Sequence, residues 1–132
     1  MWPFAADKKR RVLVVDDDVS ARTMMGMFFS EIGWSVKEAA NGRDGVDAAV
    51  AEPPDLIILD FDMPVMRGPD ALVLLRATPK TAKVPVLMVT ARATLDDVDA
   101  CLERGANDYV TKPLDLLKFK AKVEHLVPAP KE

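Results

Sequence analysis

Two short runs of apolar residues end directly in aspartate, and this pattern constrains the fold more than any other feature of the chain. Residues 56–59 precede Asp60, and residues 12–15 precede Asp16 and Asp17. Four consecutive apolar residues, several of them β-branched, predict a strand that is buried on both faces. In open sheets built from such strands, ligands bind beyond the carboxyl ends of the strands. The two runs therefore predict a site that contains carboxylates at one edge of a buried sheet.

The rest of the chain alternates predicted strands and helices. Further strands are expected over residues 35–39, 84–90 and 108–112, and helices over about 20–32, 45–51, 69–78, 95–104 and 115–126. Five strands that alternate with five helices predict an α/β fold with a single doubly wound parallel sheet and helices on both faces.

Apolar residues at helical spacing predict which helix faces are buried. The first helix should face inward with Ala21, Met24, Met25, Phe28 and Ile32. The last helix should do so with Leu116, Phe119, Val123 and Leu126.

Local signals predict the ends of the helices. Ser20 and Thr94 are candidate N-caps, because a side-chain oxygen at that position accepts a hydrogen bond from a free backbone amide. Asp18 is a further candidate for the first helix. Pro69 suits the first turn of a helix, where its missing N–H has little effect. Asn41 and Gly42 predict a turn.

Composition sets the limits of the interpretation. The 132 residues suit one domain, which we expect over residues 11–127, with a flank at 1–10 and a tail or linker stub at 128–132. Cys101 is the single cysteine, so no disulfide can form within the chain, and a reducing, cytoplasmic compartment is expected. The net charge of −3 gives no indication of direct nucleic-acid binding, and no apolar stretch suggests a membrane partner.

The strand ends carry a consistent set of chemical groups. Asp16, Asp17, Asp60, Thr90 and Lys112 all follow or end predicted strands, so a parallel sheet should bring them together. Clustered carboxylates repel one another unless a cation joins them, and Mg²⁺ prefers such oxygen ligands. An ammonium and a hydroxyl beside them are suited to phosphoryl oxygens. The sequence has no glycine-rich nucleotide loop, so the phosphoryl group must arrive on another molecule.

At these positions the chain resembles the response-regulator receiver family, the CheY-like domains of two-component signalling, over about residues 11–127. The matching motifs are Val14-Val15-Asp16-Asp17, Leu59-Asp60 followed by Met63-Pro64 and Gly68, Val89-Thr90-Ala91, and Tyr109-Val110-Thr111-Lys112-Pro113. The resemblance implies the flavodoxin-like strand order 2-1-3-4-5 and a cis peptide before Pro113.

The resemblance also implies a role for each site residue. Asp60 would accept the phosphoryl group, and Mg²⁺ or Mn²⁺ would bind to it. Asp17 would be a direct ligand of the metal and Asp16 a nearby one, largely through water. The backbone carbonyl of Asp62 would be the third protein ligand.

By the same resemblance Lys112 would pair with the phosphoryl group and Thr90 would hydrogen-bond to it. Movement of Thr90 would turn Tyr109 inward and reshape the surface formed by the fourth helix, the fifth strand and the fifth helix. The donor would be a sensor histidine kinase or a histidine phosphotransfer protein. The output would be protein contacts with an unknown target, with a possible homodimer through the same surface. The chain would be a switch rather than an enzyme, with at most self-catalysed phosphoryl transfer and slow autodephosphorylation.

Three points stay open at this stage. We hypothesise that Asp62 and Arg92 face each other across the mouth of the site, because their charges are opposite and both lie two residues beyond a site residue. Asp60-Phe61-Asp62 also resembles the Asp-x-Asp motif of haloacid-dehalogenase-like phosphatases. A receiver-shaped interaction module that is never phosphorylated is a further alternative.

Overall fold

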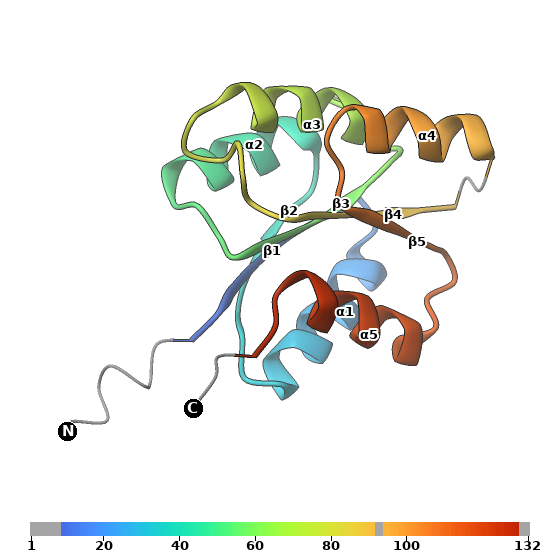
Figure 1. The fold of residues 1–132 in the computed structure, drawn as a ribbon. Helices are drawn as coiled ribbons and strands as arrows, with labels where there is room; N and C mark the ends of the chain where they lie inside the picture. The colour runs from blue at the N-terminus through green and yellow to red at the C-terminus, as the bar shows by residue number, and fades with distance from the viewer. Residues whose placement is uncertain (1–8, 92–93, 130–132) are drawn as a thin grey trace.

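Residues 9–91 and 94–129 are described in a computed structural model, and in them five parallel strands alternate with five helices (Figure 1). The strands are β1 Arg11–Val15, β2 Ser35–Ala39, β3 Leu56–Asp60, β4 Val86–Thr90 and β5 Asp108–Thr111. The helices are α1 Val19–Glu31, α2 Gly42–Ala51, α3 Gly68–Ala77, α4 Leu95–Glu103 and α5 Leu116–Leu126. The strand order is β2-β1-β3-β4-β5, which confirms the predicted doubly wound α/β fold and its order.

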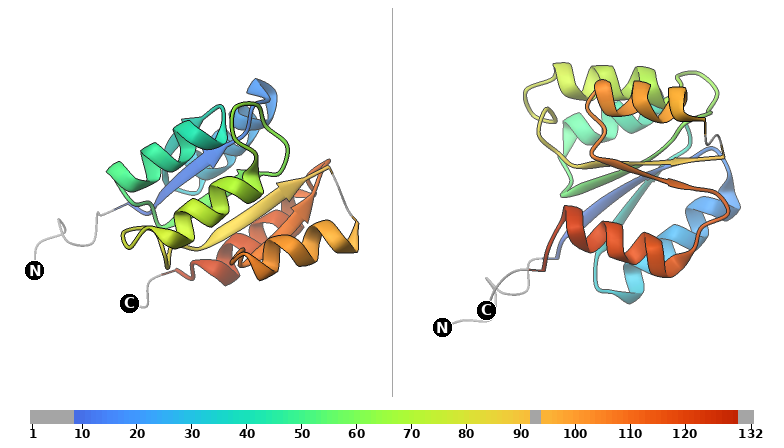
Figure 2. Two further views of the ribbon diagram at one scale, coloured as in Figure 1. Left: turned by 90° about the horizontal axis from the view of Figure 1, so that it is seen from above. Right: turned by 45° about the vertical axis from the view of Figure 1, so that its right-hand side comes forward.

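The unbroken apolar runs of the central strands serve two separate cores. Successive residues of a strand point to opposite faces of the sheet. Leu13 and Val15 pack with apolar residues of α2, α3 and α4, whereas Val12 and Val14 pack with those of α1 and α5. The views in Figures 1 and 2 show the same division, with α2, α3 and α4 over one face of the sheet and α1 and α5 over the other. Both faces of each central strand are therefore buried.

Aromatic side chains fill the core on the α1–α5 face. Phe29 of α1 is fully buried, and its ring centroid lies 5.2 Å from that of Trp34 and 5.8 Å from that of Phe119 on α5. Phe28 extends this cluster, with its ring centroid 5.2 Å from that of Phe119. Rings in such edge-to-face contacts bury a large apolar area and lock the two helices together.

The buried stripe of α1 agrees with the prediction only in part, because Ala21, Met25 and Phe28 pack in the core but two other predicted residues do not. Met25 and Phe29 face the sheet, whereas Met24 is 41% exposed and Ile32 is 37% exposed. The stripe is rotated because the Phe29 ring fits between Trp34 and Phe119, and the periodicity of a run rich in Met and Phe allows either face. Leu116 was likewise predicted to be internal on α5 but is 47% exposed.

Two helix ends also differ from the prediction. Of the two candidate caps of α1, Asp18 is confirmed and Ser20 is wrong: the Asp18 carboxylate accepts a hydrogen bond from the backbone N–H of Ser20 at 3.0 Å. The side chain of Asn41 accepts from the backbone N–H of Asp44 at 2.9 Å and starts α2 at Gly42, three residues earlier than expected.

Other local predictions are confirmed. Thr94 caps α4, Pro69 lies in the first turn of α3, and Cys101 is buried among apolar neighbours. The peptide bond before Pro113 is cis. Within residues 9–91 and 94–129, no helix combines the length and the apolar character needed to cross a membrane.

The aromatic cluster gives a test of the fold. We expect Phe29→Ala to lower the free energy of unfolding by about 3–5 kcal/mol, because it removes a buried ring and leaves a cavity. Met27→Ala on the same helix is the control, since Met27 is 60% exposed and its loss should change stability by about 0.5 kcal/mol or less. Urea unfolding of both variants measures the difference. Equal losses would contradict the assigned face of α1.

Candidate functional site

Polar side chains from four neighbouring strands meet at the carboxyl edge of the sheet. Asp16 follows β1, Asp60 ends β3, Thr90 ends β4 and Lys112 follows β5. The register pairs Asp60 with Val89 and Thr90 with Thr111, so these strands end at nearly the same level. Asp16, Asp60 and Thr90 are buried, with exposed fractions of 0%, 5% and 3%. The structure thus brings together residues that lie almost one hundred positions apart in the chain.

One ammonium group lies between the two buried carboxylates. Lys112 Nζ is 2.9 Å from Asp16 Oδ2 and 3.5 Å from Asp60 Oδ1. Backbone amides complete the arrangement: Asp18 N–H donates to Asp16 Oδ1 at 2.9 Å, and Phe61 N–H donates to Asp60 Oδ1 at 2.9 Å. With both acids ionised, two buried negative charges would face one positive charge among the described residues of the site.

This imbalance determines how the groups titrate. Burial and the charge of Asp16 raise the pKa of Asp60 to about 7, although Lys112 and the Phe61 amide act in the opposite direction. Burial alone would lower the pKa of Lys112, but its hydrogen bond with Asp16 and the charges of Asp60 and Asp16 raise it. Lys112 therefore stays protonated, and Asp60 loses its proton at a higher pH than an ordinary aspartate does.

The carboxylates fit a divalent cation. Oxygens of Asp16, Asp17 and Asp60 lie within 4.8 Å of one another, and Asp17 is exposed at the mouth of the site. Mg²⁺ binds to one or two carboxylates and keeps several waters, so an arrangement of buried and exposed acids suits it. A cation here would also relieve the repulsion that raises the pKa of Asp60.

The loop after β3 is fixed by two close backbone approaches. A Cβ at residue 68 would lie 2.1 Å from the carbonyl oxygen of Asp60, and Gly68 N–H donates to the carbonyl of Phe61 at 3.0 Å. A Cβ at residue 42 would lie 2.4 Å from the carbonyl of Met66, which accepts from Gly42 N–H at 3.1 Å. Only glycine fits at either place. The sequence analysis missed Gly42, because the contact depends on how α2 lies beside this loop.

Two other predicted residues occupy the surroundings of the site. Tyr109 is half-buried on β5, and Lys122 Nζ lies 5.6 Å from its ring centroid while also pairing with Asp108 at 2.9 Å. Asp62 forms an ion pair with Arg67, with Arg67 Nη2 3.2 Å from Asp62 Oδ1. Arg92 lies outside the described residues, so its predicted pairing with Asp62 stays a prediction.

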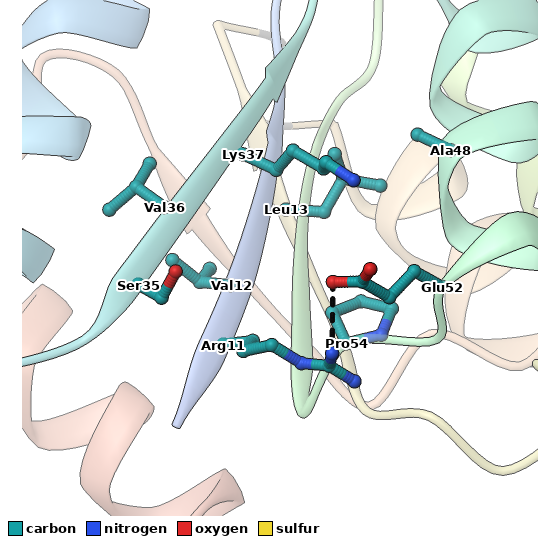
Figure 3. A pocket seen from close by; sticks show the side chains of 9 residues that line it. All are labelled: Arg11, Val12, Leu13, Ser35, Val36, Lys37, Ala48, Glu52 and Pro54. Atoms are coloured by element: carbon teal, nitrogen blue, oxygen red, sulfur yellow. Dashed lines mark hydrogen bonds and ion pairs between the residues drawn. The ribbon is translucent and has the colours of Figure 1, made fainter. Parts of the chain in front are cut away.

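A separate pocket lies at the other end of β1 (Figure 3). It is lined by residues of β1, β2, α2 and the turn that follows α2. Arg11 donates to Glu52 at 2.9 Å and to the carbonyl of Pro53 at 2.7 Å across its floor. These groups already satisfy one another and tie the start of β1 to the turn after α2. The carboxylate cluster is distinct from this pocket, because Asp16 follows the opposite end of β1.

The comparisons with known proteins decide the family. The sequence model of the response regulator receiver domain matches residues 12–124. The chain belongs to this family. The receiver is 36% identical over 117 residues to the DNA-binding dual master transcriptional regulator RpaA of Synechocystis, a match that covers 89% of the chain and 48% of RpaA. The chain spans about half the length of the curated relatives that it matches first.

Solved structures agree with this assignment. A putative response regulator from Chloroflexus aurantiacus superimposes with a TM-score of 0.87 at 30% identity, and the match covers 92% of this chain and all of that one. The receiver domain of a sensor histidine kinase from Pseudomonas aeruginosa gives a TM-score of 0.85 at 27% identity, with 92% of this chain and 100% of that chain covered. That structure holds a magnesium ion in its active-site cleft.

The charge imbalance predicts that removal of the Asp60 carboxylate stabilises the fold and that the size of this effect depends on pH. In metal-free buffer, Asp60→Asn should raise Tm at pH 8 by about 3–6 °C, the change that about 1 kcal/mol produces in a domain of this size. The folded protein holds the Asp60 proton up to about pH 7, whereas the unfolded chain releases it near 3.8. Wild-type stability should therefore fall as pH rises between these values, and the advantage of asparagine should shrink as pH falls from 8 toward 4.

Thermal melts of both proteins with EDTA at several pH values measure this difference. Asp55→Asn, at the opposite end of the sheet, checks that removal of a carboxylate charge does not raise Tm by itself. A lower Tm for Asp60→Asn at pH 8 would show that Lys112 outweighs the repulsion.

Proposed function

We propose that this receiver is a phosphorylation-activated response regulator of a two-component phosphorelay, with Asp60 as the phospho-acceptor. The proposal rests on one observation above all: Asp60 is a buried carboxylate at the carboxyl edge of the sheet, within reach of Lys112 Nζ and of the oxygens of Asp16 and Asp17. The family assignment supplies the context, since receivers are the partners of histidine kinases in two-component signalling. The donor is a phosphohistidine of a sensor kinase or of a phosphotransfer protein.

In the proposed step, a carboxylate oxygen of Asp60 attacks the phosphorus atom. The P–N bond of the phosphohistidine breaks as the new P–O bond forms, and the imidazole nitrogen keeps the electron pair and takes up a proton. Lys112 remains protonated, so its ammonium can bind a phosphoryl oxygen once Asp60 has become an acyl phosphate. Thr90, buried at the end of β4, would donate its hydroxyl to another phosphoryl oxygen.

Asp17, Asp16 and the backbone carbonyl of Asp62 would hold Mg²⁺, or Mn²⁺ in its place. When bound, the metal ion neutralises charge on the phosphoryl oxygens and favours the ionised form of Asp60. The protein's own contribution is to keep Asp60 positioned by the Phe61 amide and screened from water by its burial.

The output is proposed to run through β5. Thr90 pairs with Thr111 and Met88 with Tyr109 across β4 and β5, so a shift of Thr90 toward the phosphoryl group would act two residues along the strand from Tyr109. The exposed surface of α4, β5 and α5 would then bind an unidentified downstream protein or a second copy of the chain in the cytoplasm. RpaA is described as DNA-binding, but the receiver itself is proposed to act by protein contacts and not to touch nucleic acid directly.

Intact mass spectrometry tests the proposal. After incubation with Mg²⁺ and acetyl phosphate, the wild type should gain the mass of one phosphoryl group, because Asp60 can attack the acyl phosphate. The gain should disappear in Asp60→Asn and after EDTA treatment.

Two other outcomes bear on the proposed function, and the first would contradict it. No gain by a well-folded wild type would favour a receiver that is never phosphorylated. Steady consumption of acetyl phosphate without a detectable adduct would have two explanations, a phosphatase activity or an adduct of very short lifetime. Rapid quenching distinguishes them.

A further inference from the structure

Arg67 lies at the start of α3, but the requirements of helix capping do not explain an arginine at this position. It is the N-cap of α3 but forms no side-chain capping hydrogen bond. Serine, threonine, aspartate and asparagine are preferred at such positions, and a positive charge there opposes the helix dipole. The acidic residue of the first turn, Asp70, offsets this only in part. The side chain of Arg67 must therefore be judged by its other contacts.

Those contacts point toward the phosphorylation site. Arg67 Nη2 lies 3.2 Å from Asp62 Oδ1, and the guanidinium carbon lies 5.1 Å from the ring centroid of Phe61. Phe61 and Asp62 are the two residues that directly follow Asp60. Phe61 is buried, with 6% exposure, so its ring offers the guanidinium a fixed surface.

The same interactions contribute little to stability. The side chains of Arg67 and Asp62 are each 51% exposed, and ion pairs at that exposure are worth little because water screens them. Arg67 and Asp62 nevertheless affect the electrostatic field at the site, because every carboxylate near Asp60 repels an anionic phosphodonor. The cluster already contains Asp16, Asp17 and Asp60. Asp62 follows Asp60 by two residues and adds a further negative charge to the same loop.

We propose that Arg67 is a positioning residue of this site: it holds the Asp62 carboxylate at the rim and offsets its charge, so that an anionic phosphodonor can approach Asp60. The proposal rests on the proposed function of Asp60 and adds a residue to it. It also implies a cost, because the positive charge of Arg67 opposes binding of a divalent cation to the same cluster.

The positive charge of Arg67 should therefore favour the anionic phosphodonor and disfavour Mg²⁺ at the same site. Arg67→Gln removes the charge but keeps a polar side chain. In this variant, the rate of Asp60 phosphorylation by acetyl phosphate at low ionic strength should fall by about two- to fivefold, as expected for one partly screened charge near the donor. The Kd for Mg²⁺, measured by calorimetry without a phosphodonor, should fall by a similar factor.

Controls separate this role from a structural one. Lys120→Gln removes the same charge from α5, where Lys120 pairs with Glu124 one turn away, and should change neither quantity. Arg67→Lys should restore most of both values, because it restores the charge. In about 0.5 M salt, the difference in phosphorylation rate between wild type and Arg67→Gln should largely vanish.

The two measurements together decide the proposal. Slower phosphorylation with tighter Mg²⁺ binding supports it. If both reactions weaken, Arg67 only shapes the loop and the proposal is overturned. It is overturned as well if neither changes, or if Lys120→Gln has the same effects. If the wild type accepts no phosphoryl group, the proposed function of Asp60 fails, and the Mg²⁺ titration alone then shows whether the charge of Arg67 acts on the site.

Discussion

The rest of the site depends on the repulsion between the buried carboxylates of Asp16 and Asp60. Among the described residues, Lys112 is the cation that offsets it. Removing two carboxylates from water is unfavourable unless positive charge or protons compensate for it. Lys112 lies 2.9 Å from Asp16 and 3.5 Å from Asp60, and burial followed by the charge of Asp16 still raises the pKa of Asp60. A cation that joins the acids would relieve their repulsion, so the cluster is suited to a metal ion on electrostatic grounds alone.

The sheet supports this unfavourable arrangement because its two cores are independent of it. Leu13 and Ile57 belong to the core under α2, α3 and α4, and Val14 and Ile58 to the core under α1 and α5. Apolar burial on both faces holds β1 and β3 in register, and the register places Asp16 and Asp60 side by side whatever their charge. The acids are thus positioned by residues that take no part in the chemistry.

Much of the fold and of the site could be predicted from the sequence. The physical reason for this also explains which predictions failed. Unbroken apolar runs that end in polar residues identify central parallel strands, and their ends must converge, so Asp16, Asp60, Thr90 and Lys112 could be grouped in advance. The face of α1 could not be predicted, because Met24 and Met25 are both apolar and periodicity does not choose between them. The packing of Phe29 against Trp34 and Phe119 makes that choice, and Phe119 comes from a distant part of the chain.

The path of the loop after β3 explains why Arg67 could not be found from the sequence. A lone arginine five residues after an aspartate has no fixed geometry in an irregular loop. Here Gly68 passes against the carbonyl of Asp60 and Gly42 holds the carbonyl of Met66, so the chain turns back on itself and returns Arg67 to Asp62. The same backbone contacts that fix Asp60 therefore also fix the charge at its rim. A substitution at Gly68 would disturb Asp60 and Asp62 together, whereas one at Arg67 is proposed to change the electrostatic field at the site and leave the position of Asp60 intact.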